Sequence, residues 1–355
     1  MRDKTVLITG NLGYIGVELS SYLKKKYKKI FLIGYETGYF LKNSINKKKL
    51  ENKNVDLQIF SDLRDLNYDQ LNNIKIDAVI HLAAISNDPM GNFFIKPTRQ
   101  INTIYSKKFI DWAKKTGIKK FIFASSCSVY GFSNKVCNET SKTNPLTEYA
   151  KSKLEIEKYL KKKTNKKFKA ISLRFSTACG ASKMLRLDLV LNDFVASALS
   201  TKKIKLLSNG NALRPLIDVY DMCKTLIWAI DYNFKNFLCV NVGNENMNYR
   251  IVELAHLVQK FLPYAKISIN HNNLDNRSYK VGFSKLKKIY KGYGKMKNIN
   301  FSIKNLVKIL KKNEFNDKNF RKSYLMRLVS LKKQIKQGKL SNNLKILNDK
   351  RYYNN

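Results

Sequence analysis

The sequence of 355 residues predicts an α/β protein built on a doubly wound parallel sheet, with a smaller C-terminal lobe interleaved with that sheet. Two patterns predict this class. Short apolar runs rich in β-branched residues alternate with helical patterns through the first half, as in parallel sheets covered by helices on both faces. The first run leads directly into three glycines, Gly10, Gly13 and Gly16, after which a helical pattern begins.

Six strands and three helices are expected in the first half of the chain. The strands are predicted at residues 4–8, 29–33, 54–60, 77–82, 120–125 and 169–175. The helices are predicted at about residues 14–25, 100–115 and 149–163. We therefore expect a dinucleotide-binding domain over residues 1–178, which receives later contributions from about residues 215–245.

The second half has a looser pattern. Candidate elements at residues 187–199, 203–207, 219–230 and 237–242 indicate a substrate lobe over residues 179–300, interleaved with late pieces of the sheet. Residues 301–355 are expected to form a basic helical segment. No apolar run approaches the roughly 20 residues of a membrane span, and no signal peptide is expected.

The cysteines and the charge limit the class of protein. Five scattered cysteines without a C-x-x-C motif suit a reducing cytoplasm, and no metal site is predicted. The formal net charge is +42, from 68 Lys and Arg against 26 Asp and Glu. Either a nucleic-acid partner or an anionic small substrate would suit this charge. Because lysines are spread along the whole chain and Arg is scarce, we do not expect nucleic acid to be the main ligand.

The order of strand, glycine turn and helix is the one that a dinucleotide pyrophosphate site needs. Gly10 permits the tight turn, Gly13 lets the backbone approach the phosphates, and Gly16 lets the helix pack on the strand. The unpaired amides at the helix start then face the anion. This order is typical of Rossmann-type folds, so the opening residues predict a bound dinucleotide.

An acidic residue near the end of the second strand should hold the adenosine ribose. Gly34 occupies the usual position, and Glu36, two residues further on, is the acid assigned to this role. With no Arg nearby in the sequence, Glu36 favours NAD over NADP.

Tyr149 and Lys153 are four residues apart and therefore share one face of a predicted helix. A cation beside a phenol should lower the tyrosine pKa from about 10, so that Tyr149 can act as a general base towards a hydroxyl. The hydroxyl-rich turn that begins at Ser125 follows the fifth strand, at the edge where parallel sheets bind ligands.

The chain resembles the extended short-chain dehydrogenase/reductase family, specifically its nucleotide-sugar epimerases and dehydratases, over about residues 4–290. The motifs that carry this resemblance occur in order: Thr9-Gly10-Asn11-Leu12-Gly13-Tyr14-Ile15-Gly16, Asp62-Leu63-Arg64-Asp65, His81-Leu82-Ala83-Ala84, Ser125-Ser126-Cys127-Ser128-Val129-Tyr130-Gly131, Tyr149-Ala150-Lys151-Ser152-Lys153 and Leu173-Arg174-Phe175.

The resemblance implies roles for individual residues. The catalytic set is Ser126, Tyr149 as base, and Lys153. The cofactor would be contacted by the glycines, Glu36, Tyr149 and Lys153. It would also be contacted by Tyr14, Ile15, Asp62 at the adenine, Leu63, Leu82, Ala83, Ala84 and Asn102. Substrate contacts would be Ser126, Asn192, and two arginines for the nucleotide diphosphate, Arg214 and Arg277.

The implied reaction is transient oxidation of a nucleotide sugar, most naturally at C4, with NAD as cofactor. Family dehydratases place an Asp-Glu pair after the catalytic hydroxyl, where this chain has Cys127 and Ser128. This difference favours 4-epimerisation, and the alternatives are 4-dehydrogenation, 4-ketoreduction and 4,6-dehydration. A cofactor-loaded, RNA-associated protein is the non-enzymatic alternative. The family also implies a homodimer formed through helices 100–115 and 149–163.

Overall fold

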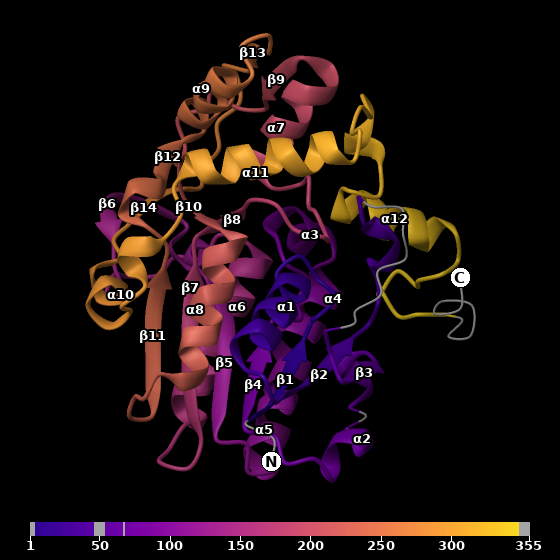
Figure 1. Ribbon diagram of the computed structural model, residues 1–355, viewed down its shortest axis with the longest axis vertical. Helices are drawn as coiled ribbons and strands as arrows, with labels where there is room; N and C mark the ends of the chain where they lie inside the picture. Colours follow the sequence, from indigo (N-terminus) through magenta and orange to yellow (C-terminus); the bar gives the residue numbers. More distant parts are fainter. Residues whose placement is uncertain (1–3, 46–53, 67, 348–355) are drawn as a thin grey trace.

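A seven-stranded parallel sheet forms the larger lobe of the structure, a computed structural model that describes residues 4–45, 54–66 and 68–347. The strand order is β11-β7-β5-β4-β1-β2-β3 (Figure 1). The strands are β1 (Lys4–Thr9), β2 (Ile30–Glu36), β3 (Leu57–Phe60), β4 (Ala78–His81), β5 (Lys120–Ser126), β7 (Lys169–Phe175) and β11 (Phe237–Val242). The predicted doubly wound sheet is confirmed, and its last strand comes from the second half of the chain.

Helices cover both faces of this sheet. One face carries α1 (Gly16–Lys26) and α8 (Val219–Asp231), and the other carries α2 (Asp69–Asn72), α5 (Ser106–Lys115) and α6 (Glu148–Lys163). Successive strand residues point to opposite faces. Val6 and Ile8 therefore join the cluster under α1 and α8, whereas Leu7 joins the cluster under α5 and α6.

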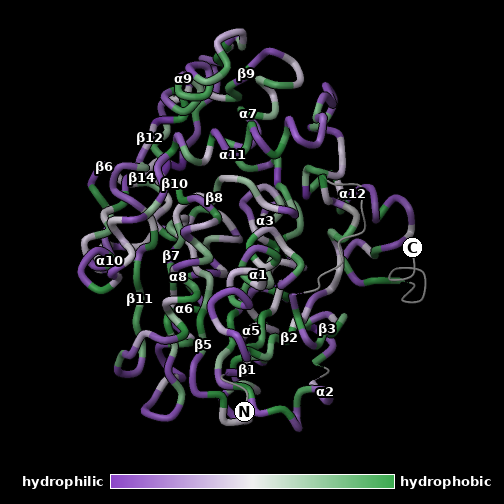
Figure 2. Tube along the Cα trace, viewed as in Figure 1, coloured by the Kyte–Doolittle hydropathy of each residue, from purple (hydrophilic) through white to green (hydrophobic). Residues whose placement is uncertain are grey.

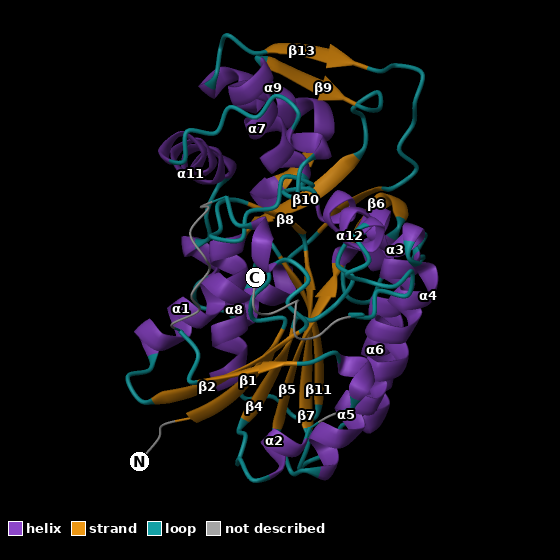
Figure 3. Cartoon of the chain, turned by 90° about the vertical axis from the view of Figure 1, so that its right-hand side faces the viewer, coloured by secondary structure: helices purple, strands orange, loops and turns teal. Residues whose placement is uncertain are grey.

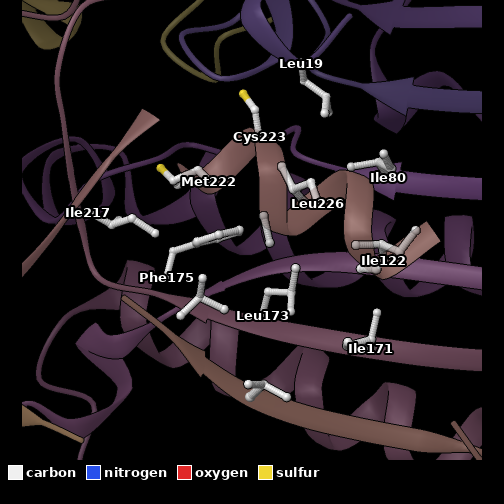
Figure 4. Packing of buried hydrophobic residues seen from close by; sticks show 14 of the residues in the cluster. Leu19, Ile80, Ile122, Ile171, Leu173, Phe175, Ile217, Met222, Cys223 and Leu226 are labelled. Carbon is white, nitrogen blue, oxygen red and sulfur yellow. The ribbon is translucent and has the colours of Figure 1, made fainter. Parts of the chain in front are cut away.

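Buried apolar side chains fill the space between the sheet and α8 (Figure 4). Ile122, Ile171 and Leu173 from the strands face Met222 and Leu226 from the helix. In Figure 2 the hydrophobic colour follows the sheet strands, and the hydrophilic colour dominates the outer turns. Continuous apolar runs predicted these strands because both of their faces are covered.

The smaller lobe lies above the carboxyl ends of the sheet strands (Figure 1). Its strands are β8 (Thr177–Cys179), β10 (Leu213–Asp218) and β12 (Asn248–Arg250) in one sheet, β9 (Lys203–Leu206) with β13 (Lys266–Ile269), and β6 (Phe132–Cys137) with β14 (Ser278–Val281). Its helices are α7 (Val190–Thr201), α9 (Ile251–Phe261), α10 (Ser284–Ile289) and α11 (Ile299–Lys312). Several of these strands were not predicted, because they are short and have no clear apolar alternation.

Two segments differ from their predicted boundaries. The helix predicted at 100–115 is preceded by α3 (Asp88–Phe93) and α4 (Ile95–Thr98), and it is π-helical over Arg99–Tyr105 before α5 begins. The predicted segment 301–355 does not pack as one unit. Its α11 joins the core of the smaller lobe, whereas α12 (Arg327–Lys336) packs in a separate cluster with Tyr39, Met90 and Phe94. Residues 348–355 of that segment lie outside the described part.

The division into three domains stays a prediction. Among the described helices, none combines the length and the apolar composition that a membrane span requires.

A buried ion pair fixes α6 on the sheet. Glu157 on α6 accepts hydrogen bonds from Arg174 on β7 at 2.7–3.1 Å and from the Ser125 hydroxyl at 2.5 Å. Glu157 is 4% exposed and Arg174 is 6% exposed. Thr147 caps the same helix by accepting from the Ala150 amide, and basic residues in its last turn suit the helix dipole.

We expect Glu157→Ala to lower the free energy of unfolding by about 3–5 kcal/mol, because the Arg174 guanidinium is left buried without a counter-charge. The matched control is Glu155→Ala. Glu155 lies on the same helix and pairs at the surface with Lys107 of α5, so its loss should lower the free energy of unfolding by less than about 1 kcal/mol. Urea unfolding of both variants measures the two costs. Equal costs would show that the buried pair does not anchor α6.

Candidate active site

A cavity of about 1200 Å³ lies where the carboxyl ends of β1, β2, β4 and β5 meet the smaller lobe. Its lining includes the glycine turn, the ends of these strands, the start of α6, and loops of the smaller lobe. Figure 3 shows this junction from the side, with the sheet below and β8 and β10 above it. Parallel α/β sheets bind their ligands at this edge.

The glycine turn has the geometry that a pyrophosphate needs. Gly10 has a φ of +76°, and a Cβ there would lie 2.8 Å from the Ala83 nitrogen. A Cβ on Gly16 would lie 2.4 Å from the Gly10 oxygen, so the start of α1 must pack closely on the turn.

Gly13 differs from both of these glycines. A Cβ there would meet only the Gly10 oxygen, at 3.2 Å, and Gly13 lines the cavity. Close packing within the chain therefore does not account for Gly13, whereas approach of a ligand does. The N-cap of α1, Ile15, provides no side-chain hydrogen bond, so the first amides of the helix are left for an anion. Together these residues fit a dinucleotide.

Tyr14 and Ile15 line the cavity beside these glycines. The Tyr14 hydroxyl donates to the Gly180 oxygen at 2.7 Å, and burial raises the pKa of this phenol well above its usual value. Tyr14 therefore also ties the glycine turn to the smaller lobe.

The predicted adenosine end lies where β2 ends. Glu36 is its last residue and lines the cavity, with its carboxylate accepting from the Gly38 amide at 3.3 Å. Burial raises the pKa of Glu36. Gly34 is required for packing, because a Cβ there would lie 2.3 Å from the Asn11 amide group.

Asp62 and Leu63 line the cavity nearby. The Asp62 carboxylate already accepts from the Arg64 guanidinium at 2.5 and 3.0 Å and from the Tyr39 hydroxyl at 3.2 Å. An adenine amino group would have to share this carboxylate with Arg64.

Leu82, Ala83 and Ala84 line the cavity after β4, as predicted, but Asn102 is not among the lining residues. Its amide accepts from the Ile85 amide and donates to the Ile85 oxygen and the Ser152 hydroxyl. Asn102 thus shapes the loop that lines the cavity, and its direct contact with the cofactor stays a prediction.

Ser126, Tyr149 and Lys153 converge at the end of β5, and all three line the cavity. The Lys153 Nζ donates to the Ala124 oxygen at 2.7 Å and lies 5.5 Å from the centroid of the Tyr149 ring. A Cβ on Gly91 would lie 3.0 Å from the Tyr149 Cβ, so α3 packs directly against the start of α6.

The protonation of this group differs from the sequence-based expectation. Burial, and then the Asp88 carboxylate, raise the pKa of Tyr149 to about 12. A hydrogen bond with Ser126 and the charge of Arg186 act in the opposite direction and lower this pKa. Burial lowers the pKa of Lys153 to about 7. The expected lowering of the tyrosine pKa is wrong for this structure, because the buried lysine is itself a poor cation and desolvation of the phenolate dominates.

Arg214 and Arg277, far apart in the sequence, meet in the cavity lining as predicted. Asp275 joins them, at 2.7 Å from the Arg214 guanidinium and 3.0 Å from the Arg277 guanidinium. Arg277 also donates to Asp88 at 2.7 Å. These carboxylates orient two planar donor groups, a geometry suited to a diphosphate.

Asn192 is not part of the cavity lining. Its side chain is fully buried and bonds to the amide and oxygen of Gly180 and to the Arg186 oxygen. Asn192 thus holds the main chain around Gly180 and Arg186, and its contact with the substrate stays a prediction.

Cys127 and Ser128 differ in exposure. The Cys127 thiol is fully buried, lies 3.1 Å from the Arg174 oxygen, and has a pKa raised by burial. Ser128 lines the cavity, and its buried hydroxyl has no hydrogen-bond partner among the described residues.

Asp88, Arg186 and Arg327 are among the lining residues that sequence reasoning missed. Arg186 pairs with Asp188 at 2.8 Å and donates to Ser86. Arg327 lines the same cavity as Glu36, so the premise that no Arg lies near Glu36 holds only along the sequence. No local pattern could reveal this, because the two residues are brought together only by the fold.

A sequence model of the NAD-dependent epimerase/dehydratase family matches residues 6–243. An uncharacterised protein of Methanocaldococcus jannaschii is 28% identical over 278 residues, which cover 74% of this chain and 82% of that protein. The ADP-L-glycero-D-manno-heptose-6-epimerase of Brachyspira hyodysenteriae is 26% identical over 327 residues, or 86% of this chain and 98% of that enzyme.

A solved structure with a similar fold is the UDP-glucuronic acid 4-epimerase of Bacillus cereus in complex with UDP-glucuronic acid and NAD. Its TM-score is 0.73 at 21% identity, and the match covers 87% of this chain and 99% of that one. The family match spans more than half of the chain, and the glycine turn, Ser126, Tyr149 and Lys153 lie within it. The chain therefore belongs to the NAD-dependent epimerase/dehydratase family, as an enzyme with NAD as its cofactor.

Proposed function

We propose that this enzyme is a nucleotide-sugar 4-epimerase. One observation carries the proposal: Ser126, Tyr149 and Lys153 lie in the same cavity as the glycine turn and the pair Arg214 and Arg277. The glycine turn provides the site for NAD. The arginine pair provides two forked donors for the diphosphate of the substrate. A sugar attached to that diphosphate would lie between them, within reach of the Tyr149 hydroxyl.

Tyr149, in its phenolate form after loss of its own proton to solvent, accepts the proton of the sugar C4 hydroxyl, and Ser126 holds that hydroxyl by a hydrogen bond. NAD, when bound, supplies the acceptor for the C4 hydride and the donor that returns it. Lys153 holds the start of α6 against β5 through the Ala124 oxygen. Tyr149 gives its proton back to the new hydroxyl, and net epimerisation requires that the keto-sugar present its other face.

The residues next to Ser126 favour this outcome over 4,6-dehydration. Proton transfer at C5 and C6 needs a general acid or base, and Cys127 is buried away from the cavity with a raised pKa. Ser128 offers a hydroxyl and no carboxylate. Net 4-dehydrogenation, 4-ketoreduction and 4,6-dehydration remain the alternative reactions, and product analysis separates all of them.

The partner and compartment proposals rest on different observations. The five cysteines are free thiols, which suits a reducing cytoplasm.

A second copy of the chain would pack on the face formed by α5, α6 and Arg99–Tyr105, where Ile104 is 47% exposed.

The Tyr149→Phe variant should bind NAD and lose turnover by at least about a hundredfold, because the proton acceptor is gone while the phenyl ring still fills its site. UDP-, GDP-, CDP- and dTDP-sugars are offered as substrates, and products are identified by NMR. Ser133→Ala, on exposed β6, is the control and should keep full activity. Full turnover by Tyr149→Phe would refute the assigned base, and a 4-keto-6-deoxy product would refute epimerisation.

Lys153 should make the stability of the enzyme depend on pH. Its pKa is lowered to about 7 in the folded state and is about 10.4 when unfolded, so the folded state carries a buried cation only at low pH. That destabilisation is full below pH 7 and fades as pH rises towards 10. Lys153→Met should therefore gain about 1–2 kcal/mol more stability over the wild type at pH 6 than at pH 9.

Urea unfolding without nucleotide at both pH values measures this difference. Lys151→Met, a substitution of an exposed lysine on the same helix, should show no such pH dependence. A difference that is equal at pH 6 and pH 9 would show that Lys153 is not desolvated.

Light scattering should give a mass twice that of the 41.2 kDa chain. Ile104→Asp should shift the protein towards the single-chain mass, because it places a charge in the proposed apolar contact. Tyr264→Asp, which changes an exposed residue of the smaller lobe, should leave the mass unchanged. A single-chain mass for the unaltered protein would contradict the proposed dimer.

A further inference from the structure

Arg327, the first residue of α12, is a buried cation in the cavity lining. It is 6% exposed, and its guanidinium carbon lies 3.8 Å from the centroid of the Phe40 ring. Five arginines are buried in the described part of the chain. Four of them have a carboxylate partner within 2.8 Å: Arg64, Arg174, Arg186 and Arg214. For Arg327, no ion pair or side-chain hydrogen bond occurs with any described residue.

A buried guanidinium without a counter-charge is costly, so an unpaired one indicates an unmet anion. Burial, and then the neighbouring Arg186, lower the pKa of Arg327 to about 9. The carboxylates of Asp188 and Glu36 act in the opposite direction. Neither of them reaches the guanidinium as an ion pair. Asp188 is paired with Arg186, so Arg327 faces the cavity without a hydrogen-bonded counter-charge among the described residues.

The position of Arg327 selects one part of the dinucleotide. Arg327 lines the same cavity as Glu36, at the predicted adenosine end. Arg186 and Tyr14 of the glycine turn line this cavity as well. The group between the two riboses of NAD is the pyrophosphate, for which the glycine turn after β1 provides one side of the site. Arg327 lines the same cavity from a different element, α12.

The segment that carries Arg327 is bound to the loops around the cofactor site. We call residues 326–347 the C-terminal clasp. Gln334 donates to the Tyr39 oxygen at 2.8 Å, and Arg64 donates to the Asn343 and Leu344 oxygens at 2.6 and 2.7 Å. The clasp residues Leu331, Leu340 and Leu344 pack in one cluster with residues of the cavity loops: Tyr39, Ile85, Met90, Phe94 and Ile101.

The clasp lies beside the β2 and β3 edge in Figure 1 and next to α3 in Figure 3. The family match ends at residue 243, so the clasp lies outside the matched region. Arg64 binds both Asp62, at the predicted adenosine end of the cavity, and the main chain of the clasp. The clasp is therefore connected to the cofactor site by hydrogen bonds.

We propose that the C-terminal clasp is a cofactor-retaining element in which Arg327 binds the pyrophosphate of NAD opposite the glycine turn. The clasp then forms a second wall for the phosphates, and NAD can leave only when the guanidinium releases them. Its ring contact with Phe40 holds the guanidinium in place for this contact.

The test compares Arg327→Met with the unaltered protein. Methionine keeps an unbranched stem of similar length against Phe40 and removes the charge. The dissociation constant of NAD⁺ should rise at least tenfold by calorimetry with nucleotide-stripped full-length protein, and NADH should dissociate faster in stopped-flow fluorescence. Binding of adenosine, which carries no phosphate, should change less than twofold. Lys332→Met, which removes an exposed charge from the same helix, should bind NAD⁺ as the unaltered protein does.

Thermal unfolding without nucleotide verifies the fold of each variant. Arg327→Met should melt no lower than the unaltered protein, because it removes a buried unpaired charge, but NAD⁺ should raise its melting temperature less. Equal NAD⁺ affinity for Arg327→Met, Lys332→Met and the unaltered protein would overturn the proposal. Tighter binding of NADP⁺ than NAD⁺, reversed by Arg327→Met, would also overturn it by assigning the guanidinium to a ribose 2′-phosphate.

Discussion

The placement of one helix, α6, controls the chemistry of this enzyme. Tyr149, Lys153 and Glu157 are four residues apart and form one stripe along the helix. Lys153 binds the main chain of β5 through the Ala124 oxygen, and Glu157 binds Arg174 on β7. Two buried polar contacts therefore fix the helix on two neighbouring strands. The phenol at the start of the stripe is held over the edge of the sheet where ligands bind.

Burial shifts the pKa values of both Tyr149 and Lys153. A phenol inside the cavity keeps its proton more tightly than in water, and a buried lysine keeps its proton less tightly. Near pH 7 the phenol is therefore neutral, as it is in water, whereas Lys153 carries its positive charge only in part. Oxidation of a sugar hydroxyl then depends on interactions that favour the phenolate, among which the structure shows the Ser126 hydrogen bond and the Arg186 charge. Lys153 uses one of its N–H donors on the Ala124 oxygen, and its further donors stay available for a ligand.

Several arginines line the cavity, and most of them are held by carboxylates, in keeping with binding sites for diphosphates. Arg214 and Arg277 share Asp275, and Arg186 is paired with Asp188. These carboxylates hold the guanidinium groups in fixed orientations. Much of the net charge of +42 is spread over the surface as lysine, whereas the cavity uses arginine, which binds phosphate oxygens as a planar fork.

Local patterns in the sequence were sufficient to predict the sheet, the glycine turn and the pairing of Tyr149 with Lys153 on one helix face, because each feature depends on residues within a few positions. The run 237–242 was expected only as a candidate element, and the structure shows that it is the edge strand β11. The hydrogen bonds of Asn102 and Asn192 to the main chain could not be predicted, since an amide that shapes a loop and an amide that binds a ligand look alike in sequence. Arg327 could not be predicted, because its neighbour Phe40 lies almost 300 residues away and no periodicity links them. The raised Tyr149 pKa likewise depends on burial by distant segments.

Hydride transfer at the sugar C4 can be followed with an isotope. The enzyme is given its nucleotide sugar with deuterium at C4, in ordinary water, and the product is examined by NMR. If the hydride leaves C4 and returns to it, the epimer should carry deuterium at C4 and none should appear in the solvent. Replacement of the C4 deuterium by solvent hydrogen, or solvent hydrogen entering at C5 with the C4 centre unchanged, would contradict Tyr149-assisted epimerisation at C4.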